Sequence, residues 1–218
     1  MAWDDTSHES RPGVLISHAW GGRSDVEDRK AVELAELGYV GFAIDLYGKG
    51  VRGSNPVENA ALMQPLLDDR VSLQQRMQLA LSQCRKQKEI DATRVAAMGF
   101  CFGGLCVLDL ARSGADVIGV ASFHGLFVPP GNTAENKITA KILVLHGWDD
   151  KLATPDQVVA LAEELTAAGS DWQIHGYGHT VHAFSNPNAN DPDNGNVYSP
   201  EADRRSWQNL QLFLAELF

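Results

Sequence analysis

Three residue types that act together in nucleophilic catalysis occur in this chain in a suitable order: Cys101, Asp150 and His182. A thiol nucleophile needs a general base, and an imidazole base needs a carboxylate that fixes its tautomer and stabilises its charged form. The cysteine lies in Gly99-Phe100-Cys101-Phe102-Gly103, with glycine two residues before and two residues after the sulfur. This is the nucleophile-elbow pattern with cysteine in the serine position. The spacing predicts a thiolate that attacks a carbonyl carbon.

The elbow requires a strand before the cysteine and a helix after it. An apolar run at 94–98 predicts the strand, and the apolar segment 105–111 predicts the helix. Glycines suit such a turn because strand and helix backbones approach closely there. The helix N-terminus favours a thiolate. The alternative interpretation is an inert buried cysteine in a glycine turn.

The acid and the base each have a competitor nearby. Asp150 follows the apolar strand predicted at 141–146, where a catalytic carboxylate belongs, and its neighbour Asp149 is more typical of a turn cap. His182 stands in a loop that would hold it at the sheet edge, and His179, closer to the preceding strand, is the second choice. We therefore predict a triad of Cys101, Asp150 and His182.

A tetrahedral intermediate also needs hydrogen-bond donors for its oxyanion. The residue after the nucleophile, Phe102, supplies one backbone N–H. The other is expected from the loop His18-Ala19-Trp20-Gly21-Gly22 after the first strand, with the Trp20 N–H favoured and Ala19 close behind. The alternative is an ordinary tight turn with Trp20 in the core.

The elements that must position these residues alternate along the chain. Strands are expected at 13–18, 39–45, 94–98, 117–123, 141–146 and 171–177. Helices are expected at 25–37, at 58–88 with a break near Pro65, after the elbow, at 155–168 and at 200–218. Strand–helix alternation with apolar strands predicts an α/β fold: a mostly parallel sheet with helices on both faces. Since each candidate follows a strand, all of them should meet at one edge of the sheet.

Length and composition bound the remaining possibilities. The 218 residues predict a single domain over 1–218, and 44% hydrophobic with 21% charged residues is typical of a globular protein. A net charge of -10 without a basic cluster disfavours nucleic acid, and no apolar run approaches a membrane span. The acidic start of the chain does not resemble a secretory signal. Three cysteines without paired spacing favour a reducing cytoplasm and disfavour a metal site.

The chain resembles the dienelactone hydrolase family of α/β-hydrolases. The segments that carry the resemblance are 18–22, 45–48, 99–104, His146-Gly147 with Asp150, and 182–187. The resemblance implies a triad carried by Cys101, Asp150 and His182. It also implies hydrolysis of a small-molecule carboxylic ester or lactone through an acyl-enzyme, without a metal or organic cofactor.

Two departures from the family pattern stand out. Ala19 occupies a position where the family commonly has a glutamate that controls the resting thiol. The family also usually begins with an extra strand or hairpin, and only residues 1–12 precede the first strand here, so this N-terminal hairpin is expected to be short or missing. An open edge of this kind would suit a second copy of the chain, which makes a homodimer one expectation.

The pocket around the triad is predicted less sharply. Tyr47, His124, Trp148 and Phe184 follow strands and are candidates for its walls. The resemblance implies that an arginine holds a substrate carboxylate, for which Arg52, Arg70 and Arg76 are candidates. Two other functions suit the same residues: thioester hydrolysis or acyl transfer on the same triad, and ligand binding by a catalytically weak protein.

Overall fold

The computed structural model describes residues 1–6, 9–133 and 135–218 as strands alternating with helices. The strands are β1 (Arg11–Ser17), β2 (Val40–Ala43), β3 (Ile90–Phe100), β4 (Gly119–Phe123), β5 (Lys141–Gly147), β6 (Trp172–Tyr177), β7 (Asn190–Asp191) and β8 (Asn196–Val197). The helices are α1 (Asp25–Glu36), α2 (Pro56–Asp68), α3 (Arg70–Arg85), α4 (Phe102–Arg112), α5 (Pro155–Ala167) and α6 (Pro200–Leu217).

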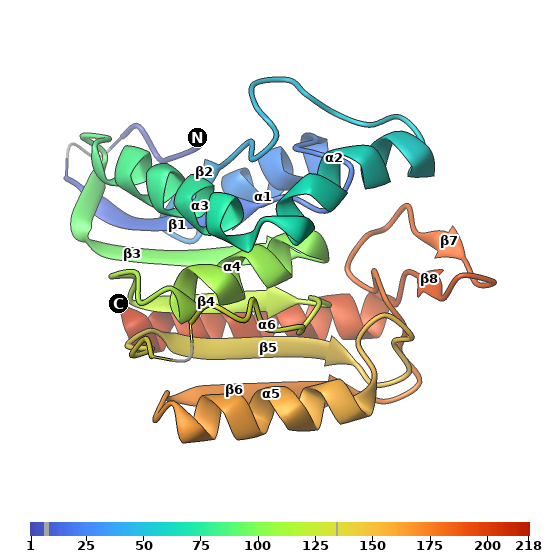
Figure 1. Ribbon diagram of the computed structural model, residues 1–218. Coiled ribbons are helices and arrows are strands. Elements are labelled where there is room, and N and C mark those ends of the chain that lie inside the picture. The colour runs from blue at the N-terminus through green and yellow to red at the C-terminus, as the bar shows by residue number, and fades with distance from the viewer. Residues whose placement is uncertain (7–8, 134) are drawn as a thin grey trace.

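Six strands form one sheet in the order β2-β1-β3-β4-β5-β6, and every neighbouring pair is parallel (Figure 1). The carboxyl ends of these strands therefore meet at one edge, as expected from the sequence. The predicted α/β fold, with a parallel sheet between two layers of helices, is confirmed.

Each strand contributes side chains to two cores because successive residues point to opposite faces of a sheet. In β1, Leu15 belongs to the core under α3, α4 and α5, whereas Val14 and Ile16 belong to the core under α1 and α6. The helix α4 is buried along its whole length. The nucleophile elbow is consequently supported by packed elements on all sides.

The chain before β1 adds little to the sheet. Ala2 and Gly41 exchange two backbone hydrogen bonds, of 2.9 and 3.0 Å, in an isolated antiparallel bridge on the outer edge of β2. Among the described residues before β1, this bridge is the pairing that reaches the outer edge of β2.

Two local predictions need correction. Pro65 does not break the long helical region: it lies inside α2, and the break falls at Asp69, which ends α2 and caps α3 by accepting a hydrogen bond from the Ser72 N–H. The cause is the cap, whose side chain satisfies a free amide of the new helix. The content of Asn, Pro, Asp and Gly in the segment 186–196 predicts a surface loop, but the segment carries β7 and ends in β8.

A buried ion network ties α4 to the helices beside it. Asp109 receives two hydrogen bonds from Arg70, of 2.6 and 2.7 Å, and also contacts Arg112. Arg112 is almost fully buried and forms a bidentate salt bridge with Glu164 of α5. Since each buried charge has an opposite charge beside it, the network links α3, α4 and α5 without an uncompensated ion.

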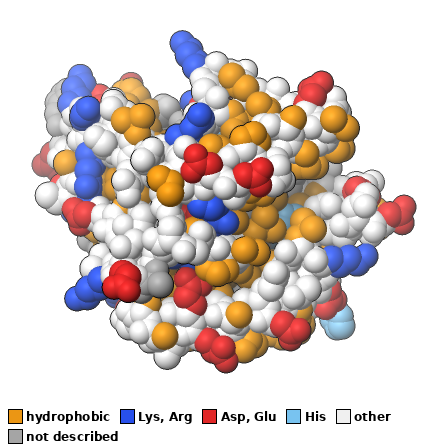
Figure 2. All heavy atoms as spheres, viewed as in Figure 1, with side chains coloured by type: hydrophobic (Ala, Val, Ile, Leu, Met, Phe, Trp, Pro, Cys, Tyr) orange, Lys and Arg blue, Asp and Glu red, His pale blue; other side chains and the backbone are white. Residues whose placement is uncertain are grey.

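Charges of both signs are interspersed on the face of the molecule shown in Figure 2, which has no extended basic region. No helix in the described ranges is both long enough and apolar enough to cross a bilayer.

Candidate active site

Cys101 lies at the turn between β3 and α4 in a strained backbone conformation, with φ 54° and ψ -116°. The flanking glycines are required by close backbone approach. A Cβ atom on Gly99 would lie 2.1 Å from the carbonyl oxygen of Gly103, and one on Gly103 would lie 2.3 Å from that of Ser17. Strain of this kind persists only where the surroundings impose it, and it concentrates at functional sites. The elbow thus presents the sulfur at the carboxyl edge of the sheet.

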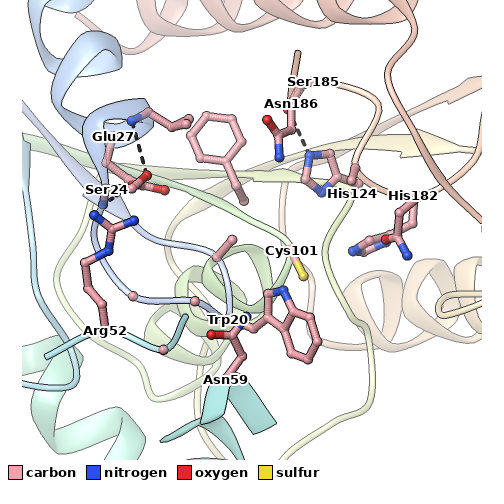
Figure 3. Close-up of a pocket in the computed structure, with 18 of the residues that line it drawn as sticks. Trp20, Ser24, Glu27, Arg52, Asn59, Cys101, His124, His182, Ser185 and Asn186 are labelled. Atoms are coloured by element: carbon pink, nitrogen blue, oxygen red, sulfur yellow. Dashed lines mark hydrogen bonds between the residues drawn. The ribbon is translucent and has the colours of Figure 1, made fainter. Parts of the chain in front are cut away.

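His182 and Asp150 form a short hydrogen bond beside the elbow. The imidazole Nδ1 lies 2.7 Å from the Asp150 Oδ2, and both side chains are buried. The other carboxylate oxygen of Asp150 accepts the N–H of Leu152 at 2.8 Å, which holds the carboxylate in place. Figure 3 shows the His182 ring directed toward the Cys101 sulfur. The structure therefore brings together the three side chains predicted as a triad.

The charge state of His182 follows from this environment. Burial lowers the pKa of His182, but the neighbouring Cys101 and Asp150 outweigh burial and raise it to about 10. The Nε2 atom is buried and has no hydrogen-bond partner within the described ranges. This atom is thus free to exchange a proton with the thiol.

The two competing residues lie together at the surface. The ring nitrogen Nδ1 of His179 is 3.9 Å from the carboxylate of Asp149, and the His179 side chain is fully exposed. Neither residue lines the cavity that holds Cys101. Their position separates them from the elbow and favours the inner pair, Asp150 and His182.

The expected oxyanion donors have free backbone amides. Neither the Trp20 N–H nor the Phe102 N–H donates a hydrogen bond to any residue that the structure describes. Phe102 opens α4 directly after the nucleophile, and Trp20 lines the same cavity as Cys101. Free amides at the start of a helix and in a glycine loop are suited to binding an oxyanion.

A cavity of about 310 Å³ opens beside the sulfur. Its walls combine the catalytic candidates with polar side chains from loops on both sides, among them Arg52, Asn59 and Asn186 (Figure 3). Arg52 forms no ion pair with a described residue, and Figure 3 shows its guanidinium on the wall away from His182. The cavity is therefore of a size and polarity for a small molecule with polar groups.

Of the four predicted wall residues, His124 lines this cavity and the other three do not. Tyr47 turns its hydroxyl away to the Trp20 carbonyl, 2.9 Å distant, and Phe184 is fully buried in the core under α1 and α6. Trp148 lies at the surface with 44% of its area exposed. The sequence placed all four after strands, but the direction of each loop side chain depends on packing that the sequence pattern does not show.

The His124 side chain is held in place by a hydrogen bond and by ring packing. Its Nε2 lies 2.8 Å from the Ser185 Oγ, its backbone has a positive φ of 37°, and its ring packs edge-on against His182 at 5.1 Å between centroids. Burial and the neighbouring His182 hold the pKa of His124 well below its ordinary value. A neutral imidazole therefore braces the face of His182.

The three candidate arginines lie in different surroundings, and one of them lines the cavity. Arg70 pairs with Asp109 in the buried network, and Arg76 donates to the Leu46 carbonyl at 2.5 Å. Only Arg52 among the three reaches the cavity. Sequence reasoning missed Asn59, Ser185, Asn186 and Asn196 as wall residues; for Asn186 and Asn196, the single signal was their place in the polar segment after His182.

His146 ends the strand predicted at 141–146, where the sequence favours a structural histidine with bonded ring nitrogens over a catalytic one. It is fully buried, but neither ring nitrogen is bonded to a described residue. Its ring lies between those of Phe127 and Trp148. In the described part of the chain, no group of three or more His, Cys, Asp or Glu side chains is arranged to hold a metal ion.

A parallel sheet with a nucleophile elbow and a hydrogen-bonded Asp–His pair at its carboxyl edge defines the α/β-hydrolase class. The model of the dienelactone hydrolase family matches residues 2–218, and the chain belongs to that family. The family places the chain among hydrolases that act on ester bonds.

Relatives and solved structures agree with this assignment. The chain is 34% identical to a dienelactone hydrolase-like promiscuous phosphotriesterase from metagenomic libraries, with a TM-score of 0.92, covering 99% of this chain and 90% of the other. An uncharacterised protein of Caenorhabditis elegans is 37% identical over 67% of this chain and 94% of its own length. A probable 2-oxo-3-(5-oxofuran-2-ylidene)propanoate lactonase of Bradyrhizobium is 24% identical over 93% of this chain and 83% of its own.

Proposed function

We propose that the chain hydrolyses small carboxylic esters or lactones through an acyl-enzyme formed on Cys101. The observation that carries the proposal is the orientation of His182. Its Nδ1 is bonded to buried Asp150, its Nε2 has no partner among the described residues, and its ring is directed toward the sulfur. This arrangement provides a nucleophile, a base and a group that orients the base, as nucleophilic catalysis requires.

Acylation begins with transfer of the thiol proton of Cys101 to the His182 Nε2. The thiolate attacks the carbonyl carbon, and the resulting oxyanion is held by the N–H groups of Phe102 and Trp20. As the intermediate collapses, the C–O bond of the ester breaks and the leaving oxygen takes the proton from His182. The alcohol departs, or, for a lactone, remains attached to the acyl group.

Deacylation repeats these steps with water as the nucleophile. Water gives a proton to the His182 Nε2 as its oxygen attacks the thioester carbonyl. The thioester bond then breaks, the carboxylic acid product leaves, and the proton returns to the Cys101 sulfur. Asp150 stabilises the imidazolium in both halves of the reaction and accepts no proton.

Arg52 points to the chemistry of the substrate. A cationic side chain without an ion pair among the described residues, on the wall of the catalytic cavity, suits a substrate that carries a carboxylate. We therefore propose that esters or lactones with a free acid group are preferred over neutral ones.

A second candidate is the cleavage of phosphotriesters by the same thiol. It is favoured by the 34% identity, over nearly the whole chain, to a promiscuous phosphotriesterase. Such a reaction would use the same nucleophile and base, with attack on phosphorus in place of carbon.

The proposal is tested by replacing the nucleophile. Cys101→Ala should lower turnover of p-nitrophenyl acetate and of a dienelactone by at least about a thousandfold, because no thioester can form. Cys84→Ala, which removes a thiol from the core outside the site, serves as the matched control and should retain activity. If Cys101→Ala keeps wild-type turnover on the preferred substrate, the proposed mechanism is wrong.

A further inference from the structure

His18 is fully buried at the end of β1, and both of its ring nitrogens are bonded. Its Nε2 lies 3.1 Å from the backbone nitrogen of Leu46, and its Nδ1 lies 2.7 Å from the carbonyl oxygen of Ala19. An amide N–H can only donate, so Nε2 accepts from Leu46 and the ring proton must be on Nδ1. His18 therefore donates to the Ala19 carbonyl. Burial lowers the pKa of His18, which is consistent with this neutral tautomer.

Tyr47 holds the next peptide group. Its hydroxyl donates to the Trp20 carbonyl at 2.9 Å, and its ring lies between those of His18 and Phe102, at centroid distances of 4.7 and 6.1 Å. Burial raises the pKa of Tyr47, so the hydroxyl keeps the proton that it donates. Two side chains thus bind two successive carbonyl groups of the loop after β1.

The orientation of a carbonyl determines that of the amide in the same peptide group. In a planar trans peptide, C=O and N–H point in opposite directions. The Ala19 carbonyl is held by His18 and also accepts the Gly22 N–H at 3.2 Å. The N–H of Trp20 belongs to the same peptide group and is consequently turned away from His18 and Gly22, without a partner among the described residues.

We propose that His18 and Tyr47 are positioning residues that preorganise the oxyanion hole by holding the Ala19 and Trp20 carbonyl groups. This inference rests on the proposed function. Arg76 supports the arrangement from outside, because its bond to the Leu46 carbonyl anchors the segment that carries Tyr47. Because both ring nitrogens of His18 are already bonded, His18 does not replace the glutamate that the family commonly has at the position of Ala19.

Tyr47→Phe tests the proposal with the smallest change, since it removes one hydroxyl and keeps the ring. We expect kcat for p-nitrophenyl acetate to fall about tenfold with KM within about twofold, because the lost anchor weakens binding of an oxyanion that exists only after attack. Alkylation of Cys101 by iodoacetamide should keep its wild-type rate, since displacement at a saturated carbon forms no oxyanion. Tyr39→Phe removes a hydroxyl far from the cavity and should change neither rate.

His18 is tested by two replacements. His18→Gln retains a donor and an acceptor and should keep more of kcat than His18→Leu, which removes both. Alkylation by iodoacetamide should again be preserved in any variant that folds, as judged by circular dichroism. If His18→Leu does not fold, the Tyr47→Phe result alone decides the proposal.

The outcomes separate this proposal from the proposed function. If Cys101→Ala is inactive while Tyr47→Phe has wild-type kcat, the hydrolase function stands and the positioning role is wrong. A fall in alkylation rate parallel to kcat in Tyr47→Phe would also overturn it, because the damage would then lie at the nucleophile. Full activity of Cys101→Ala would instead refute the catalytic proposal itself.

Discussion

The charge on His182 is the residue-scale feature that most affects how Cys101 is kept reactive. Ala19 brings no carboxylate to the thiol, His18 is bonded within its loop, and the carboxylate of Glu27, another wall residue, accepts hydrogen bonds from Ser24. Cys101 itself contributes to the raised pKa of His182. The imidazolium that forms when His182 takes the thiol proton therefore lies between the Cys101 sulfur and the Asp150 carboxylate, which stabilise its positive charge from both sides.

Asp150→Asn is the sharpest residue-scale test of the acid. The amide retains the shape of the carboxylate but can bind the wrong tautomer of His182 and cannot stabilise its positive charge. We expect kcat to fall by about 10²- to 10⁴-fold in steady-state ester hydrolysis. Asp149→Asn, at the neighbouring exposed position, is the control and should retain wild-type kcat. Equal losses in the two variants would contradict the assignment of Asp150.

At the scale of elements, the elbow depends on close packing between α4 and β1. Gly103→Ala would place a Cβ atom 2.3 Å from the Ser17 carbonyl oxygen, so helix and strand must separate. We expect a loss of about 2 kcal/mol or more in the free energy of unfolding, measured by urea denaturation. Gly178→Ala, where a Cβ meets no atom within 4 Å, should stay within about 0.5 kcal/mol. Similar free energies of unfolding in the two variants would show that the elbow tolerates a wider spacing between α4 and β1.

Much of this element-scale arrangement was predictable. Ser24 directly precedes the helix predicted at 25–37 and is a residue type that caps helices, and it caps α1 in a capping box with Glu27. Convergence of Cys101, Asp150 and His182 followed from strand order, because parallel strands share one carboxyl edge. The directions of Tyr47, Trp148 and Phe184 were not predictable, since each depends on contacts between segments far apart in sequence. The bond from Tyr47 to Trp20 joins residues 27 positions apart.

At the scale of the whole molecule, buried histidines make the free energy of unfolding depend on pH, and they do so in two opposite directions. Burial lowers the pKa values of His18, His124 and His146. The unfolded chain binds more protons at these residues below pH 6.5, so their contribution to stability is lost as the pH falls below that value. His182 acts in the opposite sense: its contribution is present below pH 6.5 and is lost as the pH rises toward about 10.

His146→Leu tests how much one buried histidine contributes to the loss of stability below pH 6.5. The imidazole is buried with no hydrogen-bond partner among the described residues, so an apolar side chain leaves no polar atom unsatisfied there. We expect the free energy of unfolding, measured by urea denaturation, to fall less between pH 7 and pH 5 in the variant than in the wild type. An equal or larger fall in the variant would show that His146 takes up its proton without cost in the folded state.

The acyl-enzyme on Cys101 can be detected by mass spectrometry of protein quenched in acid during turnover of p-nitrophenyl acetate. We expect a population of chains heavier by one acetyl group, with the added mass on the peptide that contains Cys101, and no such population in Cys101→Ala. Acetylation at another residue that forms and decays at the rate of turnover, with Cys101 unmodified, would contradict it.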